Sequence, residues 1–308
     1  MSLEANVGSL TLSSPLIGAS GLFGFGDEYG ELLDLSVFGA VVTKTITMRP
    51  RDGNPPPRVV DLGHGMINSI GLENPGIHWF VEEKLGEIDI PCRLIVSVGG
   101  DTIDDYRRVA SLLEPADGIA ALEVNISCPN VDKGGLSFGC DADSTSAVIG
   151  AVRGETGLPL IAKLPPLVSC IADIADAACA SGADALAVSN TLPSISINIE
   201  SERPRLGAGK GGLSGPPLKP VSLFHVYNLA GALDVPIIGI GGIETADDAI
   251  EYILAGACAF EIGSVILKWL NSPADIVKGI KEFMSARGYR SIEDFKGKAL
   301  LRKEESGG

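Results

Sequence analysis

The stretch Ile119-Ala-Ala-Leu-Glu-Val124 runs directly into Asn125-Ile-Ser-Cys-Pro-Asn130, and the fold can be worked out from this junction. The first half is a short apolar run of the kind that forms a buried strand, and the second half carries two amides, a hydroxyl and a thiol. Strand ends hold side chains on a rigid scaffold, so polar groups there suit the lining of a pocket. The same junction, a buried strand followed by polar groups or glycines, recurs along the chain.

Eight short apolar runs alternate with longer amphipathic segments over almost the whole sequence. Each run is rich in Val, Ile, Leu or Ala, as strands buried on both faces of a parallel sheet are. Eight strand–helix alternations predict an α/β fold, specifically a (β/α)8 TIM barrel. A doubly wound open sheet is the alternative, but no run marks an edge strand and no dinucleotide fingerprint occurs. The expected strands are Leu16–Ala19, Ala40–Thr43, Arg93–Val96, Ala121–Val124, Leu160–Lys163, Ala185–Val188, Pro236–Ile240 and Ala259–Ile262.

Helices are expected between the strands, where apolar residues recur at a spacing of three and four. Thr102 and Thr245 each precede acidic residues and resemble N-caps, and Gly182 and Gly256 fit helix ends. The clearest helices are Asp104–Leu113, Ala172–Ala180 and Ala246–Ala255.

Both ends of the chain add to the predicted barrel. Residues Val7–Leu12 are expected to form an N-terminal hairpin that closes its bottom, and Pro273–Lys298 an extra C-terminal helix. No linker is evident, so residues 1–308 are expected to form a single domain.

Composition narrows the possible partners. The 24 basic and 39 acidic residues give a net charge of −15, which opposes attraction to nucleic acid or anionic lipid. No basic and apolar leader and no long uncharged apolar stretch occur, so we expect no membrane partner and a cytoplasmic protein. The six cysteines are scattered without a CxxC pair, which predicts reduced thiols and no bound metal.

Two glycine turns follow the last two predicted strands. Gly241-Gly242 and Gly263-Ser264 both precede helical segments, at the place where barrels bind phosphate through backbone N–H groups. Ordinary turns are the alternative interpretation. A phosphate-bearing ligand, either a cofactor or a sugar phosphate, is favoured.

Two lysines occur at the same predicted rim. Lys163 ends the fifth strand and Lys44 follows the second. A buried lysine needs an anion or a shifted pKa, so each either pairs structurally with an aspartate or faces an anionic ligand.

Cys128 has three possible roles: a small buried hydrophobe, a nucleophile or a proton acceptor. A nucleophilic cysteine needs a nearby histidine, but His64, His78 and His225 form no Cys–His signature. A general-base role is therefore more attractive than a nucleophilic one. The segment Gly134–Gly139 that follows is a candidate lid.

The motifs that carry chemistry occur in one order: Lys44-Thr45, Asn68-Ser-Ile-Gly-Leu72, Asn125-Ile-Ser-Cys-Pro-Asn130, Lys163, Asn190-Thr191, Gly211-Gly-Leu-Ser-Gly215, Gly241-Gly242 and Gly263-Ser264. With these motifs the chain resembles class 1 dihydroorotate dehydrogenases from about Leu10 to about Leu300. It is most similar to the catalytic subunit of the B type, which is linked to NAD.

This resemblance implies a flavoprotein that uses FMN to oxidise dihydroorotate to orotate in pyrimidine biosynthesis. It makes Cys128 the base that removes the C5 proton while hydride passes from C6 to the flavin, and it sets Lys163 beside the flavin N1/O2 region. The implied substrate-binding residues are Lys44, Asn68, Ser69, Ile70, Gly71, Leu72, Asn125, Asn130, Asn190 and Thr191. The implied cofactor-binding residues are Ser20, Lys44, Thr45, Ser97, Asn125, Lys163, Ser189, Gly215, Gly241, Gly242, Gly263 and Ser264.

The resemblance also implies a homodimer and a separate electron-transfer subunit that carries FAD and an iron–sulfur cluster. The chain departs from the family pattern at Ser97, where many relatives have asparagine, and over Leu192–Ser196. The alternatives are a dihydropyrimidine dehydrogenase-like enzyme acting on uracil or thymine, a phosphate-binding barrel without redox chemistry, and a non-catalytic scaffold subunit.

Overall fold

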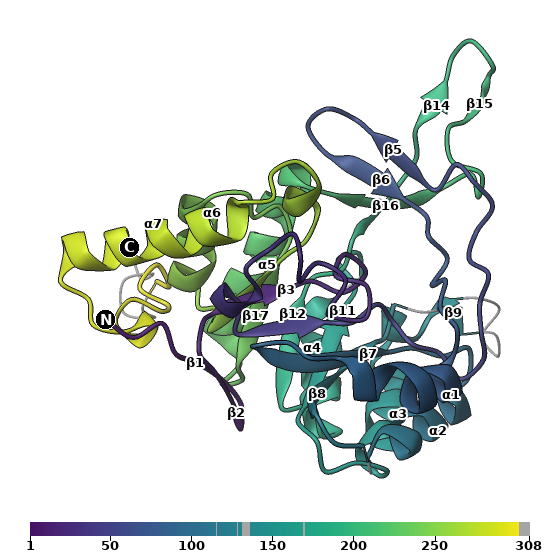
Figure 1. Cartoon of the computed structure of the whole chain (residues 1–308), viewed down its shortest axis with the longest axis horizontal. Helices are drawn as coiled ribbons and strands as arrows, with labels where there is room; N and C mark the ends of the chain where they lie inside the picture. The colour runs from purple at the N-terminus through teal and green to yellow at the C-terminus, as the bar shows by residue number, and fades with distance from the viewer. Residues whose placement is uncertain (115, 128, 131–135, 169, 302–308) are drawn as a thin grey trace.

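The eight apolar runs form one closed parallel barrel, in which the strands follow one another in chain order (Figure 1). The computed structural model describes residues 1–114, 116–127, 129–130, 136–168 and 170–301. The predicted (β/α)8 barrel is confirmed. Its strands are β3 (Leu16–Gly18), β4 (Ala40–Val42), β7 (Arg93–Val98), β8 (Ile119–Asn125), β11 (Leu160–Leu164), β12 (Ala185–Val188), β17 (Ile237–Ile240) and β18 (Ala259–Ile262).

Alternate strand residues fill the inside of the barrel, because successive side chains of a strand point to opposite faces. Ala121, Ile161 and Ala259 belong to this interior cluster, whereas their strand neighbours pack outward against the helices. The same alternation turns Glu123, Lys163 and Glu261 inward, one layer closer to the carboxyl ends of the strands. The inside of the barrel is thus apolar at the bottom and charged near the mouth.

Helices cover the outside of the barrel, and their ends follow the sequence signals. Thr102 and Thr245 both form capping boxes, with Asp105 and Asp248 respectively, and these confirm the expected helix starts. The main helices are α2 (Ile103–Leu113), α3 (Ala142–Arg153), α4 (Ile171–Ala180), α5 (Lys219–Ala232), α6 (Ala246–Leu254) and α7 (Ser272–Arg287), with a single turn at α1 (Ile77–Trp79).

The two terminal additions are also present. Strands β1 (Ala5–Val7) and β2 (Leu10–Leu12) form the N-terminal hairpin and bury Val7 and Leu12 in the interior cluster. The expected C-terminal helix extends too far, because α7 ends at Arg287, where Gly288 takes a left-handed φ of 70°. Among the described residues no helix is both long and apolar enough to cross a membrane.

A second sheet, which the sequence did not predict, is joined to the βα loops that follow β4 and β12. Its four antiparallel strands are β5 (Val59–Asp61), β6 (Met66–Asn68), β13 (Leu192–Ser194) and β16 (Gly211–Ser214). Strand β6 lies in the segment 65–76, whose glycines, asparagines and proline are more typical of a loop.

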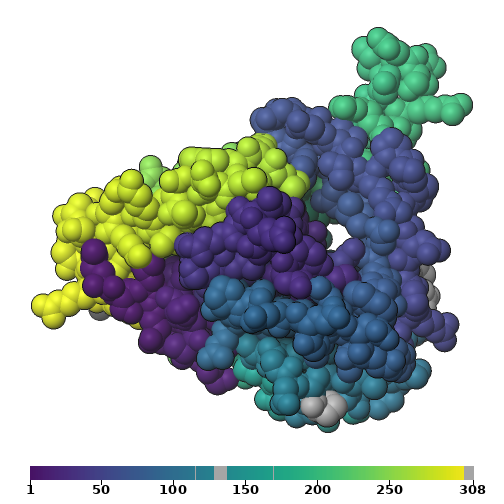
Figure 2. All heavy atoms as spheres, in the orientation of Figure 1, coloured from purple at the N-terminus to yellow at the C-terminus, as the bar shows by residue number. Residues whose placement is uncertain are grey.

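Two short hairpins complete the fold. Strands β14 (Ile197–Asn198) and β15 (Arg203–Pro204) form a hairpin that projects beyond the second sheet, and Figure 2 shows it standing clear of the rest of the molecule. Strands β9 (Pro129–Asn130) and β10 (Leu136–Ser137) pair beside the barrel.

Candidate active site

Several polar side chains meet at the carboxyl ends of the strands and form one hydrogen-bond network. The Asn125 amide, at the end of β8, donates to Thr45 Oγ1 at 3.3 Å, and its carbonyl oxygen accepts from the Asn190 amide at 3.3 Å. Asn190 in turn accepts from the backbone N–H of Thr191 at 2.7 Å. The structure thus brings together four predicted site residues from the loops after β4, β8 and β12.

The network continues to β7 and to the loop after β3. Thr45 Oγ1 lies 3.0 Å from the Oγ of Ser97, which is completely buried. The backbone N–H of Ser97 donates to Thr43 Oγ1 at 3.1 Å, and the Ser20 hydroxyl donates to the Thr43 carbonyl at 2.9 Å. Two predicted cofactor-contacting hydroxyls are therefore held in place by neighbouring strand ends.

The second sheet brings Asn68 next to this network. Asn68 of β6 is paired in register with Gly212 of β16. A methyl group on Gly212 would overlap Thr191 Oγ1, so the Thr191 side chain packs directly on the Gly212 backbone. Two predicted substrate residues that are far apart in sequence therefore meet across one glycine.

The loop after β6 is held by hydrogen bonds to Asn54, in the segment between β4 and β5. The Ser69 hydroxyl accepts from the Asn54 amide at 2.8 Å, and the Ile70 carbonyl accepts from the Asn54 backbone at 2.9 Å. Gly71 and Leu72 both have left-handed φ values, of 78° and 55°. Asn54 is thus a shaping residue of this loop that the sequence interpretation missed.

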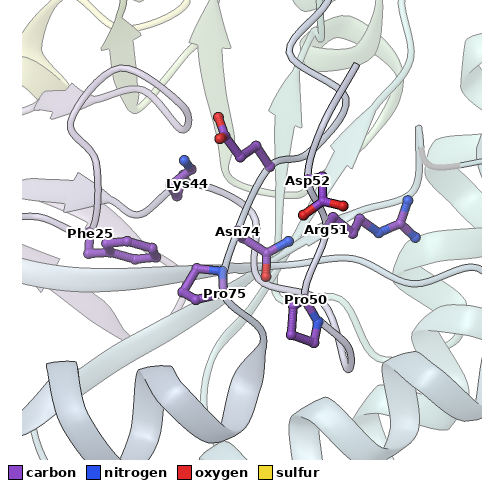
Figure 3. A pocket seen from close by; sticks show the side chains of 8 residues that line it. Phe25, Lys44, Pro50, Arg51, Asp52, Asn74 and Pro75 are labelled. Atoms are coloured by element: carbon purple, nitrogen blue, oxygen red, sulfur yellow. The ribbon is translucent and has the colours of Figure 1, made fainter. Parts of the chain in front are cut away.

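Lys44 lines an open pocket of about 490 Å³ beside the network (Figure 3). Its ammonium group lies 5.8 Å from the centre of the Phe25 ring, and it forms no ion pair within the part of the chain that the structure describes. Arg51, on the opposite side of the pocket, pairs with Asp101 at 2.6 Å. Lys44 therefore presents a positive charge to the pocket without a fixed partner. It is the only predicted site residue among those that line the pocket, namely Phe25, Lys44, Pro50, Arg51, Asp52, Glu73, Asn74 and Pro75.

Several glycine turns pack closely together near the end of β17. A Cβ on Gly242, which has a φ of 67°, would lie 2.9 Å from the carbonyl oxygen of Gly215. A Cβ on Gly215 would lie 3.1 Å from the Cα of Gly65 and 3.8 Å from Ser264 Oγ. Gly263 precedes the short helical turn Ser264–Leu267 that follows β18. Gly215 and Gly242 thus leave little room for a side chain, and Gly215 lies close to the start of the Ser264–Leu267 turn. Backbone N–H groups at such turns can bind phosphate.

Two further predicted cofactor residues contact the surrounding helices. The Ser189 hydroxyl lies 2.9 Å from the hydroxyl of Ser222 on α5 and is almost fully buried. Gly241 has a φ of 124°, and its carbonyl accepts from the Tyr252 hydroxyl at 2.8 Å. These contacts tie the end of β12 and the turn after β17 to helices α5 and α6.

Lys163 pairs with two glutamates inside the barrel rather than with an aspartate. Its Nζ lies 3.2 Å from both carboxylate oxygens of Glu123 on β8 and 3.1 Å from Glu261 on β18. Only 8% of the Lys163 side chain and 1% of each glutamate side chain are exposed. Sequence interpretation missed both glutamates, although each occurs two residues after an inward-facing alanine.

Burial and mutual repulsion shape the protonation of this cluster. Loss of solvation, followed by repulsion from Glu123, raises the pKa of Glu261 to about 8 in spite of the attraction of Lys163. Burial alone would lower the pKa of Lys163, but the two carboxylates outweigh it and the pKa is raised. Lys163 is therefore a permanent cation, and the pair of carboxylates retains a proton at neutral pH.

Part of the predicted site falls outside the described residues. Cys128 and residues 131–135, including the first part of the expected lid, lie there, and the Asn130 side chain is not described. The Ser127 hydroxyl, next to Cys128, is buried and has no hydrogen-bond partner among the residues that are described.

Known proteins resemble this chain over almost its full length. A family model described as dihydroorotate dehydrogenase matches residues 2–284. The catalytic subunit of dihydroorotate dehydrogenase B (NAD(+)) from Desulforudis audaxviator is 46% identical over 296 residues, which cover 95% of this chain and 96% of that protein. The subunit of the same name from Desulforamulus reducens is 43% identical and covers 98% of this chain and 99% of its own length.

A solved structure agrees with these matches. The crystal structure of a dihydroorotate dehydrogenase from Eimeria tenella, in complex with ferulenol, superimposes with a TM-score of 0.80 at 28% identity and covers 96% of this chain and 88% of that chain. The resemblance that the motifs predicted, including the B-type catalytic subunit, is confirmed by the names of these relatives. The chain belongs to the dihydroorotate dehydrogenase family.

Proposed function

We propose that this chain is the catalytic subunit of a B-type dihydroorotate dehydrogenase, which oxidises dihydroorotate to orotate in pyrimidine biosynthesis. Family membership supports the reaction, since the curated relatives carry that name. The observation that carries the proposal is the network of Thr45, Asn125, Asn190 and Thr191 at the barrel mouth. Amides both donate and accept hydrogen bonds, which matches the alternating N–H and C=O groups along the edge of a pyrimidine ring.

FMN is the cofactor that the proposal requires, and the residues present fit it. The glycine turns at Gly215 and Gly242 converge beside Ser264, and backbone N–H groups at such turns and at the start of a helical turn bind phosphate. Bound there, FMN supplies the hydride acceptor. We assign Gly241 and Gly263 to the same phosphate end, and Ser20, Thr45, Ser97, Asn125, Lys163 and Ser189 to contacts along the flavin.

The substrate side follows from charge and hydrogen bonding. Lys44 has no ion-pair partner among the described residues and lines the pocket, and it is the group that we assign to the carboxylate of the substrate. Asn125, Asn190 and Thr191, together with Asn130 and residues 68–72, hold the ring. Cys128 takes the C5 proton as general base, a role that rests on its place in the motif Asn125–Asn130.

The expected partners follow from the family. The words "catalytic subunit" in the names of the relatives support a second subunit, to which we assign FAD, an iron–sulfur cluster and the reduction of NAD. A homodimer of this chain and a cytoplasmic location are part of the same proposal. A single domain over residues 1–308 also remains a prediction.

An anaerobic titration of the purified protein with dihydroorotate tests the reaction. We expect a yellow protein whose flavin absorption bands bleach as dihydroorotate is added, and recover when orotate is added to the reduced enzyme. A colourless protein would favour a barrel without redox chemistry. Flavin that dihydroorotate leaves oxidised, and that uracil reoxidises once it is reduced by dithionite, would favour the dihydropyrimidine dehydrogenase-like alternative.

A further inference from the structure

Three ionisable side chains meet inside the barrel with almost no access to water. Glu123, Lys163 and Glu261 come from three different strands and are 0%, 6% and 2% exposed. Lys163 contacts both carboxylates at 3.1–3.2 Å, so a single ammonium group serves two acids. The two carboxylic acids have no individual role in the reaction proposed above.

The charge balance of this cluster requires a proton. With all three groups ionised, the interior would carry a net charge of −1, and an uncompensated charge in a dry interior costs several kcal/mol. One proton held between the two acids makes the cluster neutral, as in other closely placed carboxylate pairs. A proton held between them lets one acid donate a hydrogen bond to the other, which two bare carboxylates cannot do.

The in-register strand neighbours of Glu261 are not titratable. In the barrel it is level with Ile17 of β3 and Ile240 of β17, which are both apolar. Across the interior it faces Glu123 and Lys163, whose charges have the largest influence on its ionisation. The affinity of this cluster for a proton therefore depends on these three side chains and on whatever charge arrives at the mouth above Lys163.

We propose that Glu123 and Glu261 are positioning residues that share one proton beneath Lys163, and that they bind this proton more tightly when negative charge develops at the barrel mouth. The inference rests on the proposed function, because reduction of FMN beside Lys163 is the event that brings the negative charge. The electron pair comes from the substrate, or from dithionite in a titration, and the additional proton comes from solvent to the carboxylate pair. Nothing else is oxidised or reduced.

The pH range in which flavin reduction is accompanied by proton uptake follows from the protonation of Glu261. Its pKa of about 8 means that the pair already holds its proton below pH 8, whatever the charge at the mouth. Above pH 8 the pair is deprotonated when the mouth is neutral. A new anion raises its proton affinity, so in this range reduction is accompanied by uptake of one extra proton.

The test is the midpoint potential of bound FMN as a function of pH, in the wild type and in Glu261→Gln. Glutamine keeps the shape of the protonated acid but cannot ionise. Above pH 8 we expect the equilibrium constant for flavin reduction in the wild type to fall tenfold more steeply per pH unit than in Glu261→Gln. For a two-electron couple this is an extra slope of about 30 mV per pH unit in the midpoint potential. Glu261→Gln should lack this additional slope, and Glu123→Gln should lack it too, because a single acid beside Lys163 shares no proton. The exposed acid Glu251 provides the control Glu251→Gln, which should keep the wild-type slope.

A second measurement needs no variant. Infrared difference spectra of the wild type, recorded on reduction above pH 8, should show the appearance of a protonated carboxyl band that shifts in heavy water. Parallel pH profiles of wild type and Glu261→Gln, or no new carboxyl band, would overturn the shared proton while flavin bleaching by dihydroorotate remained normal. Loss of that bleaching in the wild type would instead overturn the proposed function.

Discussion

Replacement of Gly212 by alanine tests how closely the second sheet is fitted to the active site. A Cβ at this position would overlap Thr191 Oγ1 and would lie 2.6 Å from Thr191 Cβ, well inside van der Waals contact. Rotation of the Thr191 side chain moves Oγ1 but not Cβ, so the clash persists. Strand β16 is paired with β13 on one side and β6 on the other, so it cannot shift alone.

The cost of this clash can be estimated from other overpacked sites. Forcing one extra methyl group into a packed region costs about 1–3 kcal/mol of unfolding free energy. The displaced Thr191 also pulls on Asn190 and its 3.3 Å bond to Asn125, and a displacement of about 1 Å in a reacting site can cost about 100-fold in rate. We therefore expect Gly212→Ala to lower both urea stability and kcat/KM for dihydroorotate.

The design includes a rescue and a control. In a Thr191→Gly background the clashing Cβ is absent. Gly212→Ala should therefore lower the unfolding free energy by about 1 kcal/mol less in that background than in the wild type. Gly150→Ala is the matched control, because a methyl group added at this exposed position on α3 would have nothing within 4 Å. Alanine is also favoured over glycine within a helix by about 0.5–1 kcal/mol. The close fit between Thr191 and Gly212 would be refuted if Gly212→Ala lowered the unfolding free energy equally in the wild type and in Thr191→Gly, or did not lower it at all.

Three other substitutions probe the proposed chemistry and the buried cluster. Cys128→Ala should keep FMN and orotate binding but slow anaerobic flavin reduction by about 10²–10⁴-fold, and an unchanged rate would exclude the general-base role. Lys163→Met should lower the unfolding free energy, measured with urea at pH 8, by about 3–5 kcal/mol. The loss should be smaller at pH 5, because Glu123 and Glu261, which no longer have a cation beside them, become neutral there. The raised pKa of Glu261 favours the folded state at low pH, and this contribution is lost as the pH rises from the unfolded value of 4.5 to about 8. In that range the unfolding free energy of the wild type should fall relative to Glu261→Gln by up to about 1.4 kcal/mol per pH unit, whereas equal slopes would contradict the buried neutral acid.

The barrel was predictable because its signals are local. Each buried strand is a short apolar run, and the helix starts at Thr102 and Thr245 carry their own capping boxes within four residues. Because parallel barrel strands share one carboxyl-terminal edge, knowing the strands was enough to expect Asn125, Asn190 and Thr45 near one another. Their mutual hydrogen bonds confirm that expectation.

The second sheet was not predictable in the same way. Its strands are three or four residues long, and β16 is rich in glycine, as in Gly211-Gly212, so they lack the alternation that marks a strand. Their pairing also joins residue 68 to residue 212, a contact that no local pattern encodes. The same limit explains why Glu261 was missed as a partner of Lys163, 98 positions away.

The two lysines at the rim illustrate how strand position decides what anion a cation meets. From sequence both had the same alternatives, a structural acid or an anionic ligand. Lys163 lies within β11, two residues after the inward-facing Ile161, so the barrel surrounds it and the chain must supply its counter-charge.

Lys44 lies two residues beyond the end of β4, where the loop leaves the barrel and opens into the pocket beside Phe25. An internal carboxylate there would be exposed to water and worth little, so the charge of Lys44 is left for an incoming anion. The barrel thus neutralises Lys163 with its own acids, whereas Lys44 has no ion-pair partner among the described residues, which supports its proposed assignment to the carboxylate of the substrate.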